Sequence, residues 1–337
     1  MRRSRDGDAQ HVQVLLVGKY GLGAAAGDSV AVRGLIDRLA ERGVDAEFTA
    51  TPIQDSRGTP AVVHAMNADA PATAARALAD RLGVPLVVTT TGTDLNEGLD
   101  DPQRRVRIVS NLRAAARVVT LTEAQTQSVR RHCPRADVTR IFQRVELEAS
   151  DFDLRAAADL APEAPYALML GGFRPVKDQL FALVGWCGGA GVTLVMAGDL
   201  VDPLYGRGVH FRARATLGVK VLPALPHAHV GAALGAAFCL VNTSRSEGES
   251  RAILEAHACG CPVVARRNRG NEALVRDGID GLLFDDPEGL HAAMERLREP
   301  GTRDRLAAGA RAAAAAREAL PRDDEVLAGL YRDLAAS

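Results

Sequence analysis

Short apolar segments alternate with longer amphipathic or alanine-rich stretches along nearly the whole chain, beginning at His11. Such alternation is typical of β-α units that build parallel sheets, with a helix after each strand. In the first half the pattern predicts strands, with helices between them, at Val12–Val17, Ala61–Ala65, Pro85–Thr90, Arg117–Leu121 and Val138–Phe142. We therefore expect an α/β protein with doubly wound sheets.

The alternation stops after Phe142 and begins again at Tyr166, beyond the polar stretch QRVELEASDFDLRAAADLAPEAP. Further strands are predicted at Tyr166–Leu170, Thr193–Ala197, Lys220–Leu222, Phe238–Val241, Pro262–Ala265 and Leu282–Phe284. Because 337 residues exceed what one core usually organises, two domains are expected. We expect a disordered tail over residues 1–10, domains over residues 11–150 and 160–318, and a C-terminal helix over residues 319–337 that packs back on the first domain.

The formal net charge is only -1, so the molecule as a whole has no field that attracts nucleic acid or anionic membrane. The start, MRRSRDGDAQ, lacks the apolar segment of a secretion signal, and no apolar run approaches the roughly 18 residues of a membrane span. The five cysteines are odd in number and scattered, which is typical of reduced thiols. We expect a cytoplasmic protein with no nucleic-acid partner and no stable membrane association.

Two acidic patterns, Asp6–Asp8 and Asp151–Asp153, formally match a metal-binding D-x-D sequence. Both lie outside the predicted strand ends, and 42 acidic residues make chance matches common. Cys259 and Cys261 have no further cysteine or histidine nearby at the spacing of a metal site. We therefore expect neither a metal nor a cofactor.

The most informative segment is VNTSRSEGESRAILEAHACGCPVVA, which reads as a strand end, a polar turn and a helix that begins near Ser250. Glu247 lies in the turn and Glu255 about one and a half turns inside the helix, so both carboxylates can border a ligand at the helix start. The amides of Gly248, Glu249 and Ser250 are candidate donors to phosphate or hydroxyl oxygens. The alternative is that both glutamates are solvated acids near a helix start, where negative charge is favoured.

A second segment, LGGFRPVKDQL, follows the first strand of the second domain. It places Arg174 and Lys177 in a short strand-to-helix connection that begins with Gly171 and Gly172. Lys177 is one of only three lysines in the chain, and two fixed cations at this point could offset a diphosphate. A pair of solvated loop residues is the alternative.

The E-x7-E pattern after a strand, together with this Arg/Lys loop, resembles the retaining glycosyltransferases of family 4. The resemblance is closest to the glycosyltransferase-1-domain-containing protein 1 type, through TGTDLNE, GFRPVKD, VDP, SEGESRAILEA, PVVARRNRGN and GLLF. The chain is also similar to the selenosugar synthases of selenoneine biosynthesis, through TGTDL, LPHA and NTSRSEG. The resemblance implies a GT-B fold, in which two doubly wound, Rossmann-like domains face a central cleft.

The resemblance also implies roles for these residues. Glu255 would hold the donor's ribose hydroxyls and Glu247 the hydroxyls of the donor sugar, while Lys177 and Arg174 would clamp the diphosphate. Many members carry their arginine five residues before the lysine, where this chain has Gly172. In such enzymes an oxygen of the departing diphosphate helps to remove the acceptor proton, the anomeric configuration is retained and no metal is required.

In a GT-B cleft the first domain mainly receives the acceptor, so its strand-end loops are the candidate acceptor or sugar cleft. The candidates are Lys19, Gly27, Asp28, His64, Thr93 and Asp94. Asp28 could instead be a helix N-cap, and His64 a core residue. Many family members have a histidine where this chain has Thr91, and His227 is expected to be a helix-start residue.

We therefore expect an enzyme that moves a hexose or N-acetylhexosamine from a UDP-sugar to a small soluble acceptor, since the sequence shows no basic or amphipathic membrane-docking face. A narrower alternative is a selenosugar synthase that uses UDP-N-acetylglucosamine and selenophosphate. Alternatives of another class are a UDP-sugar epimerase and a non-catalytic protein that binds nucleotide sugars.

Overall fold

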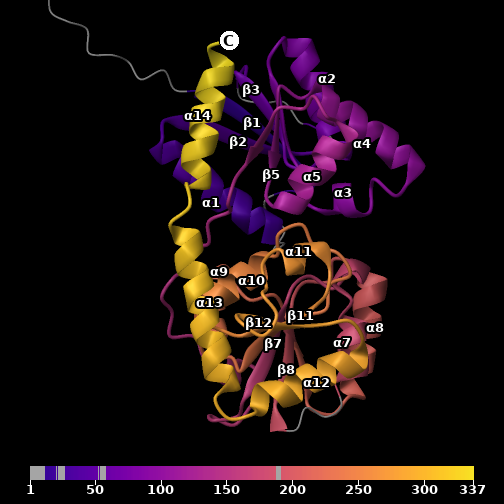
Figure 1. Ribbon diagram of the computed structural model, residues 1–337, viewed down its shortest axis with the longest axis vertical. Helices are drawn as coiled ribbons and strands as arrows, with labels where there is room; N and C mark the ends of the chain where they lie inside the picture. The colour runs from indigo at the N-terminus through magenta and orange to yellow at the C-terminus, as the bar shows by residue number, and fades with distance from the viewer. Residues whose placement is uncertain (1–11, 20, 22–26, 52, 54–57, 187–190) are drawn as a thin grey trace, which may run out of the picture.

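The chain folds into two six-stranded parallel sheets, each covered by helices (Figure 1). The computed structural model describes residues 12–19, 21, 27–51, 53, 58–186 and 191–337. The tail predicted over residues 1–10 lies outside the described residues, as does Cys187. The two sheets confirm the predicted α/β class with doubly wound domains.

The strands of the first sheet follow the order β2-β1-β3-β4-β5-β6. Their bounds are β1 Val12–Gly18, β2 Val44–Ala50, β3 Val62–Ala65, β4 Leu86–Thr89, β5 Arg117–Thr120 and β6 Val138–Arg140. The expectation of only helical structure between Val17 and Ala61 is wrong, because β2 lies there. As an edge strand paired with β1, it has mixed burial and shows neither strict alternation nor a continuous apolar run.

The helices of the first domain begin at well-defined signals. They are α1 Gly27–Glu41, α2 Ala70–Leu82, α3 Thr93–Asn96, α4 Pro102–Ala114 and α5 Glu123–His132. At α4, Pro102 follows Asp101, whose side chain accepts hydrogen bonds from two backbone amides of the first turn. At α5, Thr122 and Gln125 form a reciprocal capping box.

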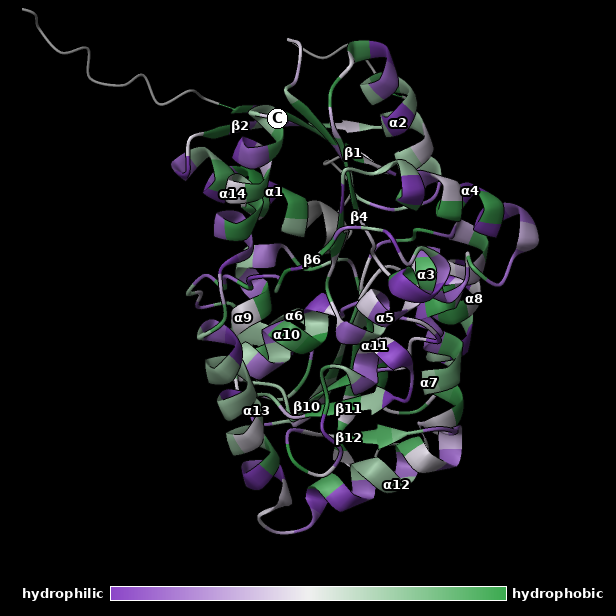
Figure 2. Ribbon diagram, turned by 45° about the horizontal axis from the view of Figure 1, so that its top comes forward, coloured by the Kyte–Doolittle hydropathy of each residue, from purple (hydrophilic) through white to green (hydrophobic). Residues whose placement is uncertain are grey.

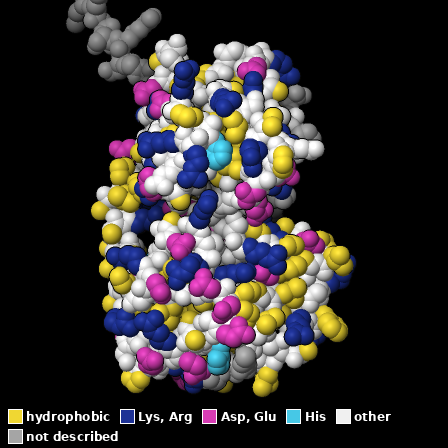
Figure 3. Space-filling model, turned by 45° about the vertical axis from the view of Figure 1, so that its right-hand side comes forward, with side chains coloured by type: hydrophobic (Ala, Val, Ile, Leu, Met, Phe, Trp, Pro, Cys, Tyr) yellow, Lys and Arg dark blue, Asp and Glu magenta, His cyan; other side chains and the backbone are white. Residues whose placement is uncertain are grey.

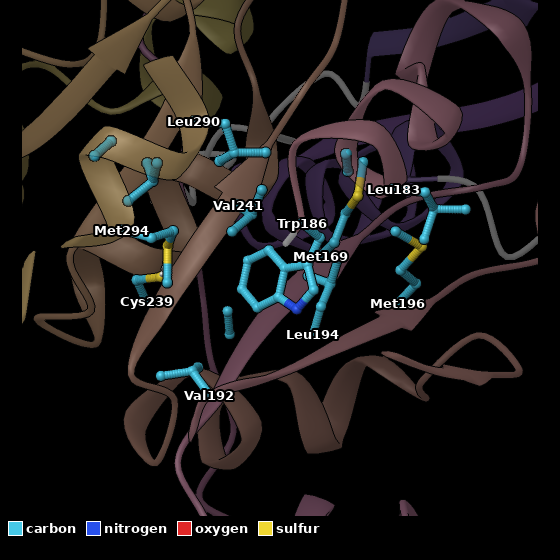
Figure 4. Packing of buried hydrophobic residues seen from close by; sticks show 14 of the residues in the cluster. Met169, Leu183, Trp186, Val192, Leu194, Met196, Cys239, Val241, Leu290 and Met294 are labelled. Carbon is cyan, nitrogen blue, oxygen red and sulfur yellow. Dashed lines mark hydrogen bonds between the residues drawn. The ribbon is translucent and has the colours of Figure 1, made fainter. Parts of the chain in front are cut away.

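The second sheet has the order β12-β11-β10-β7-β8-β9. Its strands are β7 Tyr166–Leu170, β8 Thr193–Ala197, β9 Val219–Leu222, β10 Cys239–Asn242, β11 Val263–Arg266 and β12 Gly281–Phe284. All six overlap the predicted segments. On one face Trp186 packs among Met169, Leu194 and Val241, as Figure 4 shows. This burial of large apolar side chains stabilises the domain that carries the Lys177 and Glu247 loops.

The helical elements that follow Phe142 complete the second domain and return the chain to the first. They are α6 Leu154–Ala157, the 3-10 helix Pro175–Lys177, α7 Gln179–Gly185, α8 Pro203–Arg214, α9 His227–Gly235, α10 Arg251–Ala258, α11 Arg269–Glu272, α12 Pro287–Arg298, α13 Thr302–Glu318 and α14 Asp323–Ala335. In Figure 2 the strands are largely hydrophobic, and many helices carry hydrophilic residues beside hydrophobic ones. Such banding is expected where one helix face packs on a sheet.

The last helix, α14, packs on the first domain although it follows the second in sequence (Figure 1). Leu327 and Tyr331 join the core cluster that includes Leu16 of β1. Buried ion pairs fasten the start of the helix, with Arg38 of α1 lying 3.0 Å from Asp323. The chain therefore crosses between the domains twice, once after β6 and once between α13 and α14.

Candidate active site

The two domains meet where the loop after β10 contacts α3. Asn96 donates from Nδ2 to the backbone carbonyl of Glu247 at 2.8 Å and to Ser246 Oγ at 3.1 Å. Gly92, just before α3, has φ of +113°, and a Cβ there would lie 2.4 Å from the Cα of Gly248. Only glycine fits such a conformation and such an approach. The backbones of the two domains are therefore in direct contact beside the predicted donor site.

The Lys177 and Glu247 side chains form an ion pair, with Nζ donating to Oε1 at 2.7 Å. Lys177 follows β7 and Glu247 follows β10, and these are the neighbouring strands at which the order of the second sheet reverses. The carboxyl ends of strands at such a switch point form a crevice that commonly binds ligands in open α/β sheets. The pair thus lies where the fold itself favours a ligand site.

Three polar side chains hold the Glu247 carboxylate. Besides Lys177, Ser244 donates from Oγ to Oε1 at 2.7 Å and Asn242 donates from Nδ2 at 3.4 Å. Burial alone would raise the pKa of Glu247, but these donors, Lys177 above all, outweigh it and hold the pKa below its usual value. Glu247 is therefore a carboxylate, ready to accept hydrogen bonds from hydroxyls.

The loop that carries Lys177 is fixed by its neighbours. Asp178 adopts a left-handed conformation with φ of 49°, and its carboxylate accepts hydrogen bonds from Arg245 at 2.7 Å and Arg266 at 3.0 Å. Thr243 donates from Oγ1 to the carbonyls of Lys177 and Asp178. Asp178 and Thr243 were not identified from the sequence, although both lie within the quoted motifs.

The remaining loop residues flank this pair. Gly171 has φ of +145° and lies against the Lys177 side chain, while Gly172 lies against Val201. Arg174 precedes the 3-10 helix, is partly exposed and forms no ion pair with any described carboxylate. It is therefore a cation that remains available to an anionic ligand.

Glu255 lies buried in α10, where two cationic or polar side chains meet it. Arg251 donates from Nε to Oε1 at 2.8 Å, and Nε2 of His227 lies 3.2 Å from the same oxygen. His227 is the first residue of α9, as expected from sequence. Arg251 was missed, although its position four residues before Glu255 was a readable signal for a helical pair.

The turn that leads into α10 offers backbone donors. The N–H groups of Gly248, Glu249 and Ser250 donate no hydrogen bond to a described acceptor, and Ser250 is the N-cap. Helix N-termini with open N–H groups favour anions. The side chain of Glu249 points elsewhere, because it lies 2.8 Å from Arg317 of α13. Only the backbone of Glu249 can therefore serve the predicted site.

Two candidates of the first domain lie in its interior. For His64 this agrees with the alternative of a core residue, whereas for Asp94 it corrects the expectation that the side chain faces the cleft. His64 of β3 is fully buried and hydrogen-bonds with the Tyr331 hydroxyl at 2.6 Å and Thr89 Oγ1 at 2.7 Å. The fully buried carboxylate of Asp94 accepts hydrogen bonds from the N–H groups of Ala68 and Gly92 at 2.9 Å each. Burial raises the pKa of Asp94, against these bonds.

The other candidates of the first domain lie in loops or at helix starts. Thr93 begins α3 and is partly exposed, and Lys19 is exposed directly after β1. Gly27 begins α1, followed by Asp28, whose side chain lies outside the described part of the chain. β1 and β3 mark the reversal of strand order in the first sheet, so Lys19 borders that sheet's own switch point.

Two facing domains of this kind, with a C-terminal helix that returns to the first, define the GT-B class of fold. Anabaena HepE in complex with UDP-glucose superposes with a TM-score of 0.77 at 17% identity, over 96% of this chain and 99% of that one. Sucrose-phosphate synthase from Thermosynechococcus elongatus superposes with a TM-score of 0.76 at 18% identity, over 97% of this chain and 100% of that one. These likenesses establish the GT-B fold.

The second domain also matches a known protein family. Residues 165–299, most of the second domain, match the family described as "Glycosyl transferases group 1". A 149-residue segment is 34% identical to the Glycosyltransferase 1 domain-containing protein 1 of Xenopus tropicalis, covering 43% of each chain. The alpha-D-kanosaminyltransferase of Streptomyces kanamyceticus is 27% identical over 283 residues, covering 75% of this chain and 72% of that one.

A third relative, the D-inositol 3-phosphate glycosyltransferase of Acidothermus cellulolyticus, is 43% identical over 103 residues, which cover 30% of this chain and 23% of that one. The chain thus spans less than half the length of the first curated relatives that it matches. The second domain is therefore similar to group 1 glycosyltransferase domains, and the similarity includes the Lys177 and Glu247 loops.

Proposed function

We propose that the protein is a retaining, metal-independent glycosyltransferase that moves a hexose or N-acetylhexosamine from a UDP-sugar to a small acceptor. The observation that carries the proposal is the 2.7 Å contact between Lys177 and Glu247 at the switch point of the second sheet. A fixed cation and a fixed carboxylate there match the diphosphate and the hydroxyls of one donor. The complex of HepE with UDP-glucose, on the same fold, supports the choice of nucleotide.

The donor would bind along the carboxyl edge of the second sheet. Lys177, Arg174 and the amides of Gly248 and Glu249 contact the diphosphate, and Glu255 accepts hydrogen bonds from the ribose hydroxyls. Because Arg251 and His227 contact only one oxygen of Glu255 in the described contacts, the other oxygen is available to a hydroxyl. A hydroxyl pair on ribose fits such an acceptor.

Donor binding requires the Lys177–Glu247 ion pair to share its charges with the ligand. The ammonium turns toward the phosphate oxygens, while Ser244 and Asn242 continue to hold the Glu247 carboxylate. Glu247 then accepts a hydrogen bond from a hydroxyl of the sugar. The pair therefore keeps the site electrically balanced before the donor enters.

In the transfer step the bond between the anomeric carbon and the diphosphate oxygen breaks, and a bond to the acceptor oxygen forms on the same face. The acceptor proton passes to an oxygen of the departing diphosphate, so no protein base is needed. Lys177 and Arg174 stabilise the negative charge that develops on this leaving group. Such preorganised stabilisation is commonly the largest contribution to catalysis.

The acceptor would enter from the first domain, past Thr93, Lys19 and Gly27. A panel of UDP-sugars and acceptors, selenophosphate among them, tests the proposal, with products identified by mass and the anomeric configuration by NMR. Transfer should persist in the presence of a metal chelator. An isomerised donor without transfer would identify an epimerase, and no binding or consumption of any donor would refute the proposal.

A further inference from the structure

Helix α8 exposes an apolar ridge on the second domain. Leu204 and Phe211 are 76% and 79% exposed. They lie seven residues apart, and therefore nearly two turns apart on one side of the helix. Leu217, just beyond the helix, is 81% exposed. Monomeric proteins seldom leave several neighbouring large apolar side chains in water without a binding role.

Arginines flank this ridge. Arg207 and Arg214, also seven residues apart, lie on one side of the line through Leu204 and Phe211, and Arg212 lies on the other. All three are exposed, and none forms an ion pair with a carboxylate in the described part of the chain. In residues 199–217 the only exposed acid is Asp199. The α8 face, meaning Leu204, Arg207, Phe211, Arg212 and Arg214, is thus apolar at its centre and basic at its edges.

Apolar side chains gather with basic ones on this side of the second domain, below the junction of the two domains (Figure 3). The α8 face begins beside the candidate active site, because Val201, which precedes α8, packs against Gly172 of the Lys177 loop. On the first domain, α4 lies on the same side of the molecule as α8 (Figures 1 and 2). A groove beside α4 is lined by Val106, which is 73% exposed, and by Arg76, Arg105 and Arg113.

We propose that the α8 face docks the protein reversibly on an anionic lipid bilayer. Leu204 and Phe211 would enter the boundary between headgroups and acyl chains, while the arginines contact lipid phosphates, as in helices that lie in a membrane interface. A second copy of the chain fits less well, because a twofold contact centred on this face would bring its arginines against the same arginines. The docking does not depend on which acceptor the enzyme uses.

This proposal departs from the expectation that the chain has no basic or amphipathic membrane-docking face. The formal net charge of -1 gives no sign of this basic face, because acids elsewhere in the chain balance the arginines of α8. Among the described residues no helix is long and apolar enough to cross a membrane. The contact would therefore be peripheral, with side chains entering only the surface of the bilayer.

Sedimentation of the full chain with phosphatidylcholine vesicles, with or without phosphatidylglycerol, tests the proposal. We expect binding to the anionic vesicles that weakens with added salt. Phe211→Ser should reduce it on the order of tenfold, and Arg207→Gln and Arg214→Gln about fivefold each. Ile279→Ser and Arg298→Gln are matched controls, because Ile279 is 51% exposed and Arg298 is exposed, both outside the α8 face. Neither should change vesicle binding.

The proposal would be overturned if the wild-type protein did not bind anionic vesicles, or if it bound neutral vesicles equally well. Light scattering that shows a dimer which Phe211→Ser converts to a monomer would also overturn it, since the face would then be a contact between copies. UDP binding without vesicles, measured by calorimetry on the same variants, should remain unchanged. It tests the donor site separately, so failure of docking and failure of the proposed function are distinguishable.

Discussion

The carboxylate of Glu249 lies 2.8 Å from the guanidinium of Arg317, and this ion pair joins the loop before α10 to the last turn of α13. Arg317 also donates from Nε to the carbonyl of Gln143, in the first crossing between the domains. The next residue, Arg144, donates to the carbonyl of Glu318, in the second crossing. The loop before α10 and both crossings between the domains are therefore held together by neighbouring contacts.

Replacing Arg317 with alanine should lower the free energy of unfolding by about 3 kcal/mol, because it leaves a buried carboxylate without its cation. Burial already raises the pKa of Glu249, even with Arg317 beside it. Urea unfolding of the variant measures the loss. The double variant Arg317→Met with Glu249→Gln should recover part of it, whereas strictly additive losses would show that the two side chains do not interact.

The donor site predicts different kinetic effects for two variants. Lys177→Ala should lower kcat about 100-fold or more, because the charge on the departing diphosphate loses its nearest cation. Glu255→Ala should instead weaken donor binding on the order of tenfold, since it removes an acceptor for ribose hydroxyls. Steady-state kinetics and calorimetry with the donor distinguish these effects.

The matched control for Lys177 is Lys220→Ala. Lys220 lies in β9 and faces Asp159 at 3.8 Å, away from both loops of the site. Its substitution should leave kcat unchanged. Wild-type kinetics in both Lys177→Ala and Glu255→Ala would contradict the assignment of the donor site.

Closure of the two domains should depend on Gly92. Alanine at this position strains a backbone with φ of +113° and drives a Cβ to within 2.4 Å of Gly248. We expect Gly92→Ala to hold the domains apart, lowering kcat about tenfold or more, because the catalytic groups need close positioning. Small-angle scattering should show a larger radius of gyration than for the wild type.

Gly329→Ala is the control for this substitution. Gly329 lies in α14, where an added Cβ meets nothing within 4 Å. Alanine there should leave activity unchanged and stabilise the helix slightly. A Gly92→Ala enzyme with normal kcat and wild-type dimensions would show that the contact with Gly248 has no part in the reaction.

The local pattern of apolar and polar residues was sufficient to predict most of the strands and helices. It also predicted which strands the loops of the candidate site follow. Strands such as Tyr166–Leu170 are continuous apolar runs, and the Lys177 and Glu247 loops follow such runs directly. Helix or strand period is a property of neighbouring residues, so it is readable without tertiary information. The edge strand β2 was not predicted, because its partial burial leaves its sequence with neither a helical nor a strand period.

Contacts between distant segments could not be predicted in this way. Nothing near His64 in sequence indicates that Tyr331, 267 residues later, provides its hydrogen-bond partner. The inward turn of the Asp94 carboxylate likewise depends on the amides of a loop that folds around it. A single sequence does not show whether a polar residue at a strand end is exposed or buried. An exposed side chain can bind a ligand, whereas a buried one forms hydrogen bonds that support the surrounding loop.

The buried His64 predicts a pH dependence of stability. Burial lowers its pKa from 6.5 to about 3 in the folded protein, so below about pH 6.5 the unfolded chain takes up a proton that the folded chain does not. The contribution of the neutral His64 ring to the free energy of unfolding is therefore fully present above pH 6.5. As the pH falls from 6.5 toward 3, the free energy of unfolding should decrease by up to about 1.4 kcal/mol for each pH unit.

Urea unfolding at a series of pH values checks this, with His64→Gln as the comparison because glutamine cannot titrate. The wild type should lose stability relative to His64→Gln as the pH falls below 6.5, and the difference should be constant above it. Tyr331→Phe, which removes one hydrogen bond but keeps the ring buried, should lower stability by about 1 to 3 kcal/mol without removing the pH slope. Equal dependence of stability on pH in the wild type and His64→Gln would contradict this prediction. It would mean that His64 takes up its proton as readily in the folded protein as in the unfolded chain, so that a charged ring lies against Tyr331.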